Sequence, residues 1–233
     1  ITFISFLYKI TYIVCMFKFK FNYKVGYAFT PIECQTILKD LERQKDKFLV
    51  TDDHGDLCLS VYETEISNLD DNKTKELIEY RLKELEKKLN LKFDLERFVI
   101  KYDSDRRDMQ PHYDGSCTTT LIYLNNTYVG GSTIFPLAKK EHKPQKFKPG
   151  HFINYDSNHI LSYHGGMPVT NGVKYAIALR SFKLSLWGAI TILPWRIFRD
   201  VFFERFMADR IVKRINPLVA KAFPQHYFKK NKS

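Results

Sequence analysis

The chain has 233 residues, of which 44% are hydrophobic and 27% charged. This composition excludes wholesale disorder, and the length suits one domain with extensions or at most two small domains. The formal net charge of +11 resides at the two ends: residues 1–24 carry four lysines and no acid, and residues 183–233 carry eleven Lys or Arg against three Asp or Glu. Such basic ends are either solvated surface or contacts for anionic lipid, acidic protein or nucleic acid.

The four cysteines, Cys15, Cys34, Cys58 and Cys117, lie far apart and form no CxxC pair. This is neither the spacing of a zinc finger nor the density of a disulfide scaffold. One disulfide remains open, so the sequence leaves the cellular compartment open, with a membrane-associated or endoplasmic-reticulum location among the options.

The first segment, residues 1–29, is apolar and basic. Ile1–Phe17 is interrupted by Lys9 and is shorter than the ~20 residues of a membrane span. Phe17–Phe21 alternates apolar and charged residues with the period of two that is typical of a half-buried strand. We therefore expect a strand here, with the remnant of a signal anchor as the alternative.

Two helices are predicted next. Thr30 can cap the first, and Glu33 can reach back to it as in a capping box, so a helix is expected from there to about residue 47. The second is predicted over residues 72–90, where leucines and an isoleucine form an apolar stripe between charged faces. Between the two helices, residues 52–56 have the composition of a turn.

From Phe98 onward the pattern changes to short strands separated by glycine-containing turns. The expected strands are Phe98–Tyr102, Thr118–Leu124, Ser132–Phe135, His151–Tyr155 and Lys174–Phe182. Two helices followed by many short strands predict an α+β fold, in which a sandwich or barrel carries the helices on one side.

The final segment, residues 184–233, is basic and partly apolar, and it is expected to be helical. Its apolar stretch Leu184–Trp195 is only about twelve residues long, which is too short to span a bilayer but suits an interfacial or partner-binding helix. Trp187 and Trp195 stand within or beside this stretch, near basic residues. The segment therefore predicts contact with a membrane surface, with a partner, or with the rest of the chain.

Three residues form a candidate metal site. His112 and Asp114 are two positions apart, so on a strand both side chains would point to one face. This pair alone is also consistent with a surface histidine beside a turn. His164 follows downstream, before Gly165-Gly166. Two imidazoles and one carboxylate can occupy one face of a metal and leave the opposite face open, as in non-haem Fe(II) oxygenases.

Lys174 follows His164 by ten residues and opens an apolar strand. There it either faces solvent or points into the barrel, where a buried ammonium would need an anionic partner, such as a dicarboxylate beside the metal. His159 is a competing third ligand, but no basic residue follows it at the same spacing. His54, His142, His151 and His226 are interpreted as surface or core histidines.

The region from Phe98 to Phe182 resembles the iron- and 2-oxoglutarate-dependent dioxygenases of the prolyl 4-hydroxylase and lysyl hydroxylase group. The matching segments are Tyr102, PHYDGS (111–116), LIYLN (121–125), GGSTIFP (130–136), KPG (148–150) and YHGGMPVTNGVKY (163–175). Their order and spacing match as a set. The upstream helices extend the resemblance to about residues 30–182, whereas the two ends match nothing in that group.

The resemblance implies a double-stranded β-helix, a jelly-roll barrel supported by N-terminal helices, over a dioxygenase domain of residues 30–183. The implied iron ligands are His112, Asp114 and His164. Lys174 would pair with the distal carboxylate of 2-oxoglutarate, and the implied additional contacts to this co-substrate are Tyr102 and Tyr123. Lysine rather than arginine at position 174 favours the prolyl branch of the group.

The implied activity is hydroxylation of an unactivated C–H bond, most specifically in a prolyl residue of a protein or peptide, with release of succinate and CO₂. The implied cofactors are Fe(II), 2-oxoglutarate, O₂ and L-ascorbate. A lysyl or small-molecule hydroxylase with the same cofactors, or a non-catalytic binding module on the same barrel, is the alternative. The nearly neutral core argues against a nucleic-acid substrate. The unusually charged stretch of residues 103–108 leaves the substrate open.

Overall fold

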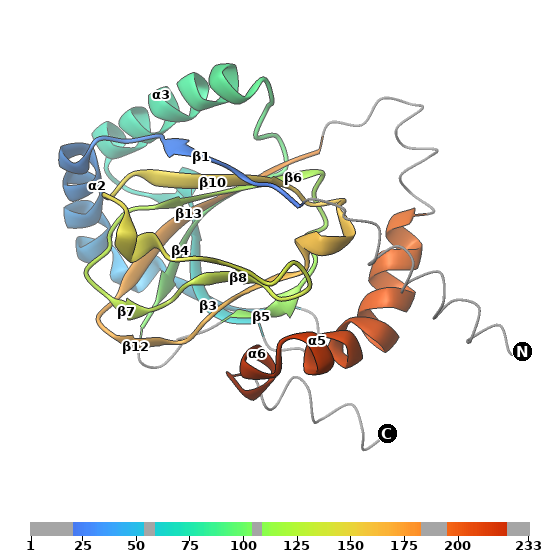
Figure 1. Ribbon diagram of the computed structural model, residues 1–233. Coiled ribbons are helices and arrows are strands. Elements are labelled where there is room, and N and C mark those ends of the chain that lie inside the picture. Colours follow the sequence, from blue (N-terminus) through green and yellow to red (C-terminus); the bar gives the residue numbers. More distant parts are fainter. Residues whose placement is uncertain (1–20, 54–58, 104–108, 183–194, 223–233) are drawn as a thin grey trace, which may run out of the picture.

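The computed structural model describes residues 21–53, 59–103, 109–182 and 195–222, which form antiparallel sheets flanked by a few helices (Figure 1). The large sheet has the order β1-β10-β6-β13-β4-β3-β2, the small sheet β5-β11-β8-β9, and β12 pairs with β7. The strands of the large sheet are β1 (Lys24–Tyr27), β2 (Leu49–Asp53), β3 (Leu59–Glu65), β4 (Glu96–Tyr102), β6 (Thr118–Tyr123), β10 (His151–Asp156) and β13 (Lys174–Ser181). The others are β5 (Met109–His112), β7 (Val129–Gly130), β8 (Thr133–Phe135), β9 (Lys140–His142), β11 (His164–Gly166) and β12 (Val169–Asn171).

Helix α2 (Pro31–Arg43) begins with the predicted capping box. The Thr30 hydroxyl accepts from the backbone N–H of Glu33 at 3.2 Å, and the Glu33 carboxylate accepts from the Thr30 N–H at 2.8 Å. The helix ends four residues earlier than predicted, and a short 3₁₀ turn, η1 (Lys45–Lys47), follows. The buried Gln44 ends it, because its side chain accepts from the backbone N–H of Asp70 at 2.6 Å and so ties this point to the chain before the next helix.

Helix α3 (Asn72–Leu89) lies where the apolar stripe predicted it. Asp71 caps it by accepting from the backbone N–H of Thr74 at 3.0 Å, and Asn90 ends it in the left-handed conformation. A further 3₁₀ turn, η2 (Ile66–Asn68), precedes the helix. Two others, η3 (Pro144–Lys146) and η4 (Ile160–Ser162), lie in the connections around β10.

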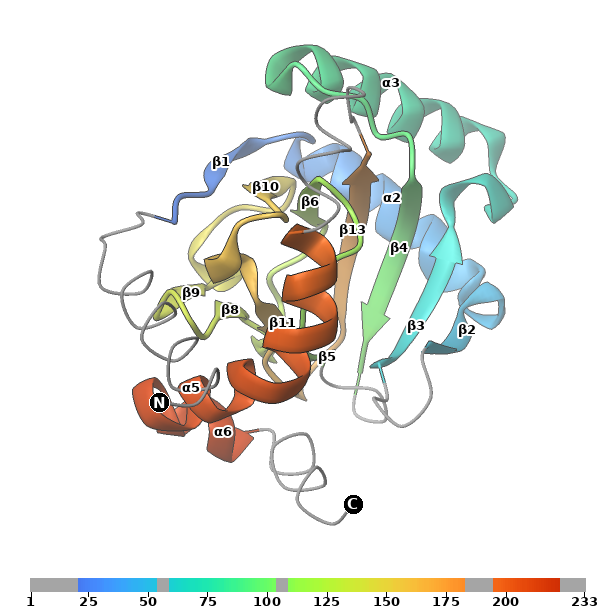
Figure 2. The same cartoon turned by 90° about the vertical axis from the view of Figure 1, so that its right-hand side faces the viewer.

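The large sheet has two differently used faces, because side chains alternate along each strand. On β13, Tyr175, Ile177 and Leu179 join the core that α2 and α3 cover. Lys174 and Ala176 point the other way and line a pocket. Figure 2 shows α2 passing behind β13, β4 and β3. The predicted arrangement of mostly antiparallel strands, with the N-terminal helices α2 and α3 on one side, is therefore confirmed.

Several strands differ from the expected pattern. Residues 17–20 of the expected first strand lie outside the described residues, and the strand that the structure does show nearby is β1, which pairs with β10. Asp52 and Asp53, predicted to begin a turn, instead pair with β3. Short strands such as β5 and β11 escaped prediction, since three or four residues are too few for a period to emerge.

The described part of the C-terminal segment is helical, as predicted. It comprises a π-helix, η5 (Phe198–Ala208), followed by α5 (Asp209–Ile215) and α6 (Pro217–Ala222). These helices pack on the protein itself, since Phe203 and Val212 share a hydrophobic cluster with Tyr113 and Tyr163. The apolar stretch before Trp195 lies outside the described residues. Among those described, no helix combines the length and hydropathy needed to cross a bilayer.

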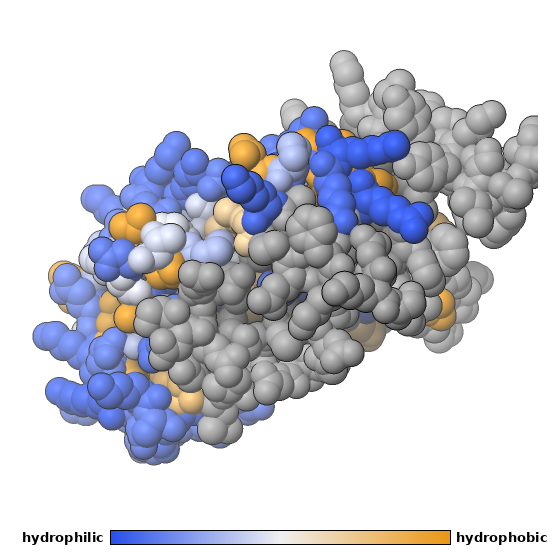
Figure 3. Space-filling view, turned by 90° about the horizontal axis from the view of Figure 1, so that it is seen from below, coloured by the Kyte–Doolittle hydropathy of each residue, from blue (hydrophilic) through white to orange (hydrophobic). Residues whose placement is uncertain are grey.

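On the described part of the face in Figure 3, polar residues predominate and hydrophobic ones lie in small separate groups. Exposed large hydrophobic side chains include Ile32 and Leu218, which lie on different helices. Single exposed apolar residues of this kind are ordinary in folded proteins, so they do not by themselves mark an interface.

Candidate metal centre and adjoining pocket

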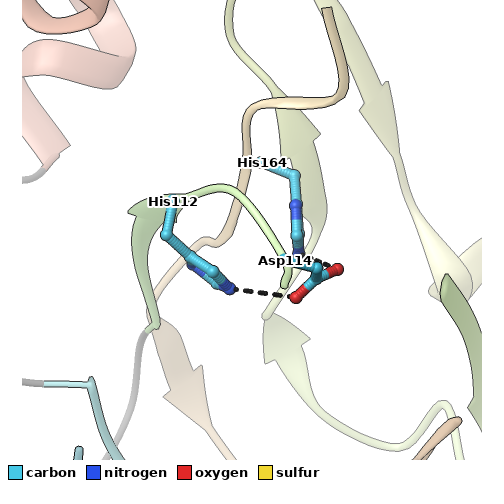
Figure 4. A group of neighbouring side chains, drawn as sticks. All are labelled: His112, Asp114 and His164. Carbon is cyan, nitrogen blue, oxygen red and sulfur yellow. Dashed lines mark ion pairs between the residues drawn. The ribbon is translucent and has the colours of Figure 1, made fainter. Parts of the chain in front are cut away.

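Strand pairing brings the two candidate histidines together. His112 is the last residue of β5 and His164 is the first of β11, and the two are direct partners across the small sheet. Asp114 lies two residues beyond the end of β5. The Nε2 atom of His112 is 3.5 Å from Asp114 Oδ1, and that of His164 is 3.6 Å from Asp114 Oδ2. The candidate ligand atoms all lie within 4.8 Å of one another (Figure 4).

Backbone carbonyls orient both imidazole rings. The Nδ1 atom of His112 is 2.7 Å from the Gln110 carbonyl, and that of His164 is 3.1 Å from the Ser162 carbonyl. An Nδ1–H donated to each carbonyl leaves the Nε2 lone pair directed at the Asp114 side, which is the tautomer that metal-binding histidines use. The buried Nε2 of His112 has no hydrogen-bond partner among the described residues. A cation at this point would satisfy it.

Asp114 is held as a carboxylate, although only 3% of it is exposed. Burial raises its pKa, but the Arg180 guanidinium, the largest of the opposing causes, helps to hold the pKa well below its usual range. The Arg180 guanidinium is 3.0 Å from Oδ1, and the Thr119 hydroxyl donates to Oδ2 at 2.5 Å. Tyr155 also donates to Oδ2, at 3.2 Å. The side chain is thus ionised and fixed, as a metal ligand must be.

Burial lowers the pKa of His164 to about 4, so its imidazole is neutral at physiological pH. Burial also disfavours the charged form of His112, but the adjacent Asp114 carboxylate more than compensates and raises its pKa overall. The donor set therefore comprises the neutral imidazole of His164, the imidazole of His112 and the ionised carboxylate of Asp114. Such a set fits a divalent transition metal.

A pocket continues from the three side chains into the sheet. Besides His112, Asp114 and His164, its lining includes polar or aromatic residues (Tyr102, Thr119, Tyr123, Thr133, Lys174, Arg180) and apolar ones (Ile100, Met109, Leu121, Ala176, Ala178). The pocket therefore joins the predicted metal ligands to all three residues predicted to hold a co-substrate.

Lys174 is buried in this pocket, with 3% of its surface exposed, so it does not face solvent. Its ammonium donates to the Gly131 carbonyl at 2.8 Å and lies 4.5 and 5.4 Å from the ring centres of Tyr102 and Tyr123. No carboxylate of the described residues pairs with it. Burial lowers its pKa to about 7. A buried cation with this surrounding favours an anionic ligand.

The two tyrosines lie on the strands beside Lys174. The Tyr123 hydroxyl is 2.7 Å from that of Thr133, and burial raises the pKa of Tyr123. The Tyr102 hydroxyl is 4.0 Å from the sulfur of Met109. The Tyr123 phenol is therefore neutral at physiological pH, and both hydroxyl groups are available as hydrogen-bond donors within the pocket.

His159, the competing third ligand, has a different role. Its Nδ1 accepts from the backbone N–H of Leu161 at 3.1 Å, which caps η4, and its ring lies 5.4 Å from that of Phe21. It does not belong to the group of described residues that could hold a metal. The other two described histidines, His142 and His151, are buried, and their rings stack in parallel 5.0 Å apart.

The sequence reasoning missed four polar residues of the site: Thr119, Thr133, Tyr155 and Arg180. Two of them carried a usable signal. Arg180 lies six residues after Lys174 on an otherwise apolar strand, and Thr119 lies four residues before Tyr123, so each pair shares a face by parity. A charged or hydroxyl side chain with the parity of a predicted site residue is a candidate member of the same site.

Comparison with known proteins gives a consistent class. No protein-family model matches the chain. A putative prolyl 4-hydroxylase of Acanthamoeba polyphaga mimivirus is 41% identical over 61 residues, which are 24% of this chain. A procollagen lysyl hydroxylase and glycosyltransferase of the same virus is 33% identical over 87 residues, 34% of this chain. The matches span only 25% and 9% of the lengths of these two relatives.

Solved structures show the same fold over most of the chain. A prolyl hydroxylase from Trichoplax adhaerens, solved with a peptide fragment of hypoxia inducible factor, superposes with a TM-score of 0.54 at 15% identity. It covers 78% of this chain and 94% of that one. A Pseudomonas putida prolyl 4-hydroxylase gives 0.52 at 13% identity, covering 74% and 98% of the two chains.

A viral collagen prolyl hydroxylase from Paramecium Bursaria Chlorella virus-1 gives a TM-score of 0.50 at 18% identity, covering 68% of this chain and 94% of that one. The chain therefore has the fold of the prolyl 4-hydroxylases. The predicted resemblance to the prolyl 4-hydroxylase and lysyl hydroxylase group is confirmed by this fold and by the two local sequence matches.

Proposed function

We propose that the chain is an Fe(II)- and 2-oxoglutarate-dependent dioxygenase of the prolyl 4-hydroxylase group, with its two main sheets forming the double-stranded β-helix of that group. One observation carries the proposal. A metal-capable set of two histidines and one aspartate opens into the same pocket as the buried, cationic Lys174. The set suits Fe(II), and the lysine suits the distal carboxylate of 2-oxoglutarate.

In this proposal His112, Asp114 and His164 hold the metal, and Lys174 holds the co-substrate with Tyr102 and Tyr123. When bound, Fe(II) and 2-oxoglutarate would supply the O₂-dependent hydroxylation of a C–H bond, with succinate and CO₂ as co-products, and L-ascorbate would keep the iron reduced.

The chain's own residues prepare the site. Arg180 and Thr119 hold Asp114 ionised and in place, since both contact its carboxylate directly. The Thr133 hydroxyl orients that of Tyr123. Apolar side chains such as Leu121 line the pocket and exclude water, which strengthens the attraction between Lys174 and an anion.

A peptidyl prolyl residue is the proposed acceptor. The three solved structures compared above are prolyl hydroxylases, and one was solved with a peptide fragment. Lys174 in place of arginine also favours the prolyl branch. A lysyl acceptor is the second candidate, because one local sequence match is to a lysyl hydroxylase. We assign catalysis to a domain of residues 30–183, preceded by the 1–29 segment and followed by the 184–233 segment, whose contact with membrane stays a prediction.

The test is turnover by the full chain with Fe(II), 2-oxoglutarate and ascorbate, in the presence of proline-rich or lysine-containing peptides. Succinate release that rises with a proline-rich peptide, together with the gain of one oxygen atom by that peptide in mass spectrometry, supports the proposal. Oxygen gained by the lysine-containing peptide instead would move the acceptor to the lysyl class. Asp114→Ala is the inactive control. Peptide binding without succinate release by the intact chain would favour the non-catalytic module and refute the enzyme.

A further inference from the structure

The C-terminal segment places a fully buried arginine beneath the loop that carries Asp114. Arg199, in η5, is 0% exposed. Its Nη2 donates to the backbone carbonyl of Asp114 at 3.1 Å, and its Nη1 donates to the carbonyl of Ser157. Its Nε contacts the Asp200 carboxylate at 2.5 Å, and its guanidinium lies 4.5 Å from the ring centre of Tyr113. One side chain thus joins the loop that carries Asp114 to the stretch of chain that carries Ser157.

A second arginine and a tryptophan reinforce this attachment. Arg196 donates from Nη1 to the Gly115 carbonyl at 2.9 Å and from Nε to the Asn158 side chain at 2.8 Å. The indole N–H of Trp195 donates to the Asn158 carbonyl at 2.9 Å. The same two stretches of chain, around residue 114 and around residue 157, therefore receive donors from both arginines.

These two stretches also meet at the carboxylate itself. The Ser157 hydroxyl is 2.8 Å from that of Thr119, which donates to Asp114 Oδ2 at 2.5 Å. A shift of the loop at residue 157 would therefore reach Asp114 by two routes, through its backbone carbonyl and through its side chain. Residues that orient a ligand in this way set metal affinity without touching the metal.

The cost of burying a guanidinium indicates that the contact is specific. A buried charge is unfavourable unless it is paired and hydrogen-bonded, and apolar residues of similar volume would hold the helix at a lower free-energy cost. Here the donors of Arg199 go to the carbonyls of Asp114 and Ser157 and to Asp200. Hydrophobic contacts of Phe203 and Val212 already attach the helices to the same region. Apolar packing therefore attaches the segment, and the hydrogen bonds of the arginine fix its position relative to Asp114.

We propose that Arg199, supported by Arg196, is a positioning residue for the metal centre, so that the catalytic unit extends beyond residues 30–183 to include the segment around residues 195–200. The inference rests on the proposed function for the identity of Asp114 as a metal ligand. It goes beyond that function because it assigns a role to a segment outside the residues to which catalysis is assigned. The expected role is to fix the Asp114 backbone where the carboxylate completes the ligand set.

The experiment measures Co(II) affinity of the full chain by its absorption spectrum, alongside thermal unfolding. Arg199→Gln should weaken Co(II) binding about tenfold to a hundredfold, and Arg199→Lys should recover part of the loss because it keeps the charge and some donors. Val212→Ala, which removes buried packing from the same segment, should lower Tm and leave Co(II) affinity unchanged. Arg210→Gln, an exposed arginine of α5, should change neither.

Unchanged Co(II) affinity in folded Arg199→Gln would overturn the inference, as would an equal loss of affinity in Val212→Ala. If Arg199→Gln does not fold, Arg196→Gln serves as the second variant, with a smaller loss expected because it frees only the Gly115 carbonyl of the ligand loop. If the wild-type chain itself binds no Co(II), the metal site of the proposed function fails, and this inference fails with it. If the wild-type chain binds Co(II) and the arginine variants bind it equally well, this inference is overturned and the proposed metal site stands.

Discussion

Replacing Lys174 by methionine should stabilise the folded protein and at the same time destroy its affinity for 2-oxoglutarate. The two effects have one cause, the burial of an ammonium that has no acidic partner among the described residues. Methionine is close in volume and carries no charge, so it removes the cost of burial and the attraction for an anion together.

The magnitude follows from the pKa. Burial lowers the pKa of Lys174 from its ordinary 10.5 to about 7, which corresponds to roughly 4–5 kcal/mol for holding the charge at neutral pH. The variant also loses the hydrogen bond to Gly131 and the contacts with two tyrosine rings, worth about 1–2 kcal/mol. We therefore expect Lys174→Met to be more stable by about 2–4 kcal/mol at pH 7, or roughly 4–16 °C in Tm.

The sign of the pH dependence is fixed by proton binding. Between pH 7 and 10.5 the unfolded chain holds the Lys174 proton while the folded chain releases it, so this group makes wild-type stability rise as the pH increases. The advantage of Lys174→Met should therefore be largest at and below pH 7 and should shrink toward pH 10.5. Lys148→Met, at an exposed lysine, should show no such trend.

Thermal unfolding of the metal-free proteins from pH 6.5 to 9.5 measures the effect. Adding 2-oxoglutarate with a divalent metal should raise the Tm of wild type but not of Lys174→Met, because ligand binding to the folded state stabilises it by mass action. Wild-type affinity should fall above pH 7, where binding must take up a proton. A variant less stable than wild type at pH 7, or a difference that does not change with pH, would refute the reasoning.

Three further predictions test the site and the fold. In an absorption titration, His164→Ala should show no Co(II) binding, while His159→Ala should still bind Co(II). The reverse result would make His159, and not His164, the third metal ligand. Gly150→Ala should destabilise the protein by more than about 2 kcal/mol in urea unfolding, because Gly150 has φ +87° and an added Cβ would lie 2.1 Å from the Phe29 carbonyl oxygen. Gly115→Ala, where a Cβ meets nothing within 4 Å, should change stability little. Burial lowers the pKa of His142 to about 3, so this group makes the free energy of unfolding fall as the pH drops below 6.5. Between pH 7 and pH 5, the free energy of unfolding of His142→Phe should therefore fall by about 1–2 kcal/mol less than that of wild type. An equal fall in both proteins would contradict the burial of a neutral His142.

The sequence by itself determined the elements with strong local signals. The capping box at Thr30 and the apolar stripe of residues 72–90 placed two helices, because caps and periodicity act within one or two turns of chain. The longer strands, such as β6 and β13, were also predicted. The three metal-ligand candidates and Lys174 were found by spacing and by resemblance to a family.

The tertiary structure alone decided which of these residues meet. His112 and His164 are adjacent because β5 and β11 pair, and neither strand is long enough to be read from its own residues. Whether Lys174 faced solvent or the pocket depended on which face of β13 the helices cover, a choice that the alternation of the strand leaves open. The strand period fixes two faces, but only packing decides which one becomes the site.

The largest difference concerns the C-terminal segment. Its basic and apolar composition was equally consistent with lipid, a partner or the chain itself. In the structure, Arg196 and Arg199 donate to backbone carbonyls of the loop around Asp114. Backbone carbonyls are present at every residue, so no sequence pattern marks the ones that a distant arginine will contact. That contact exists only because the folded chain brings residues 114 and 199 together.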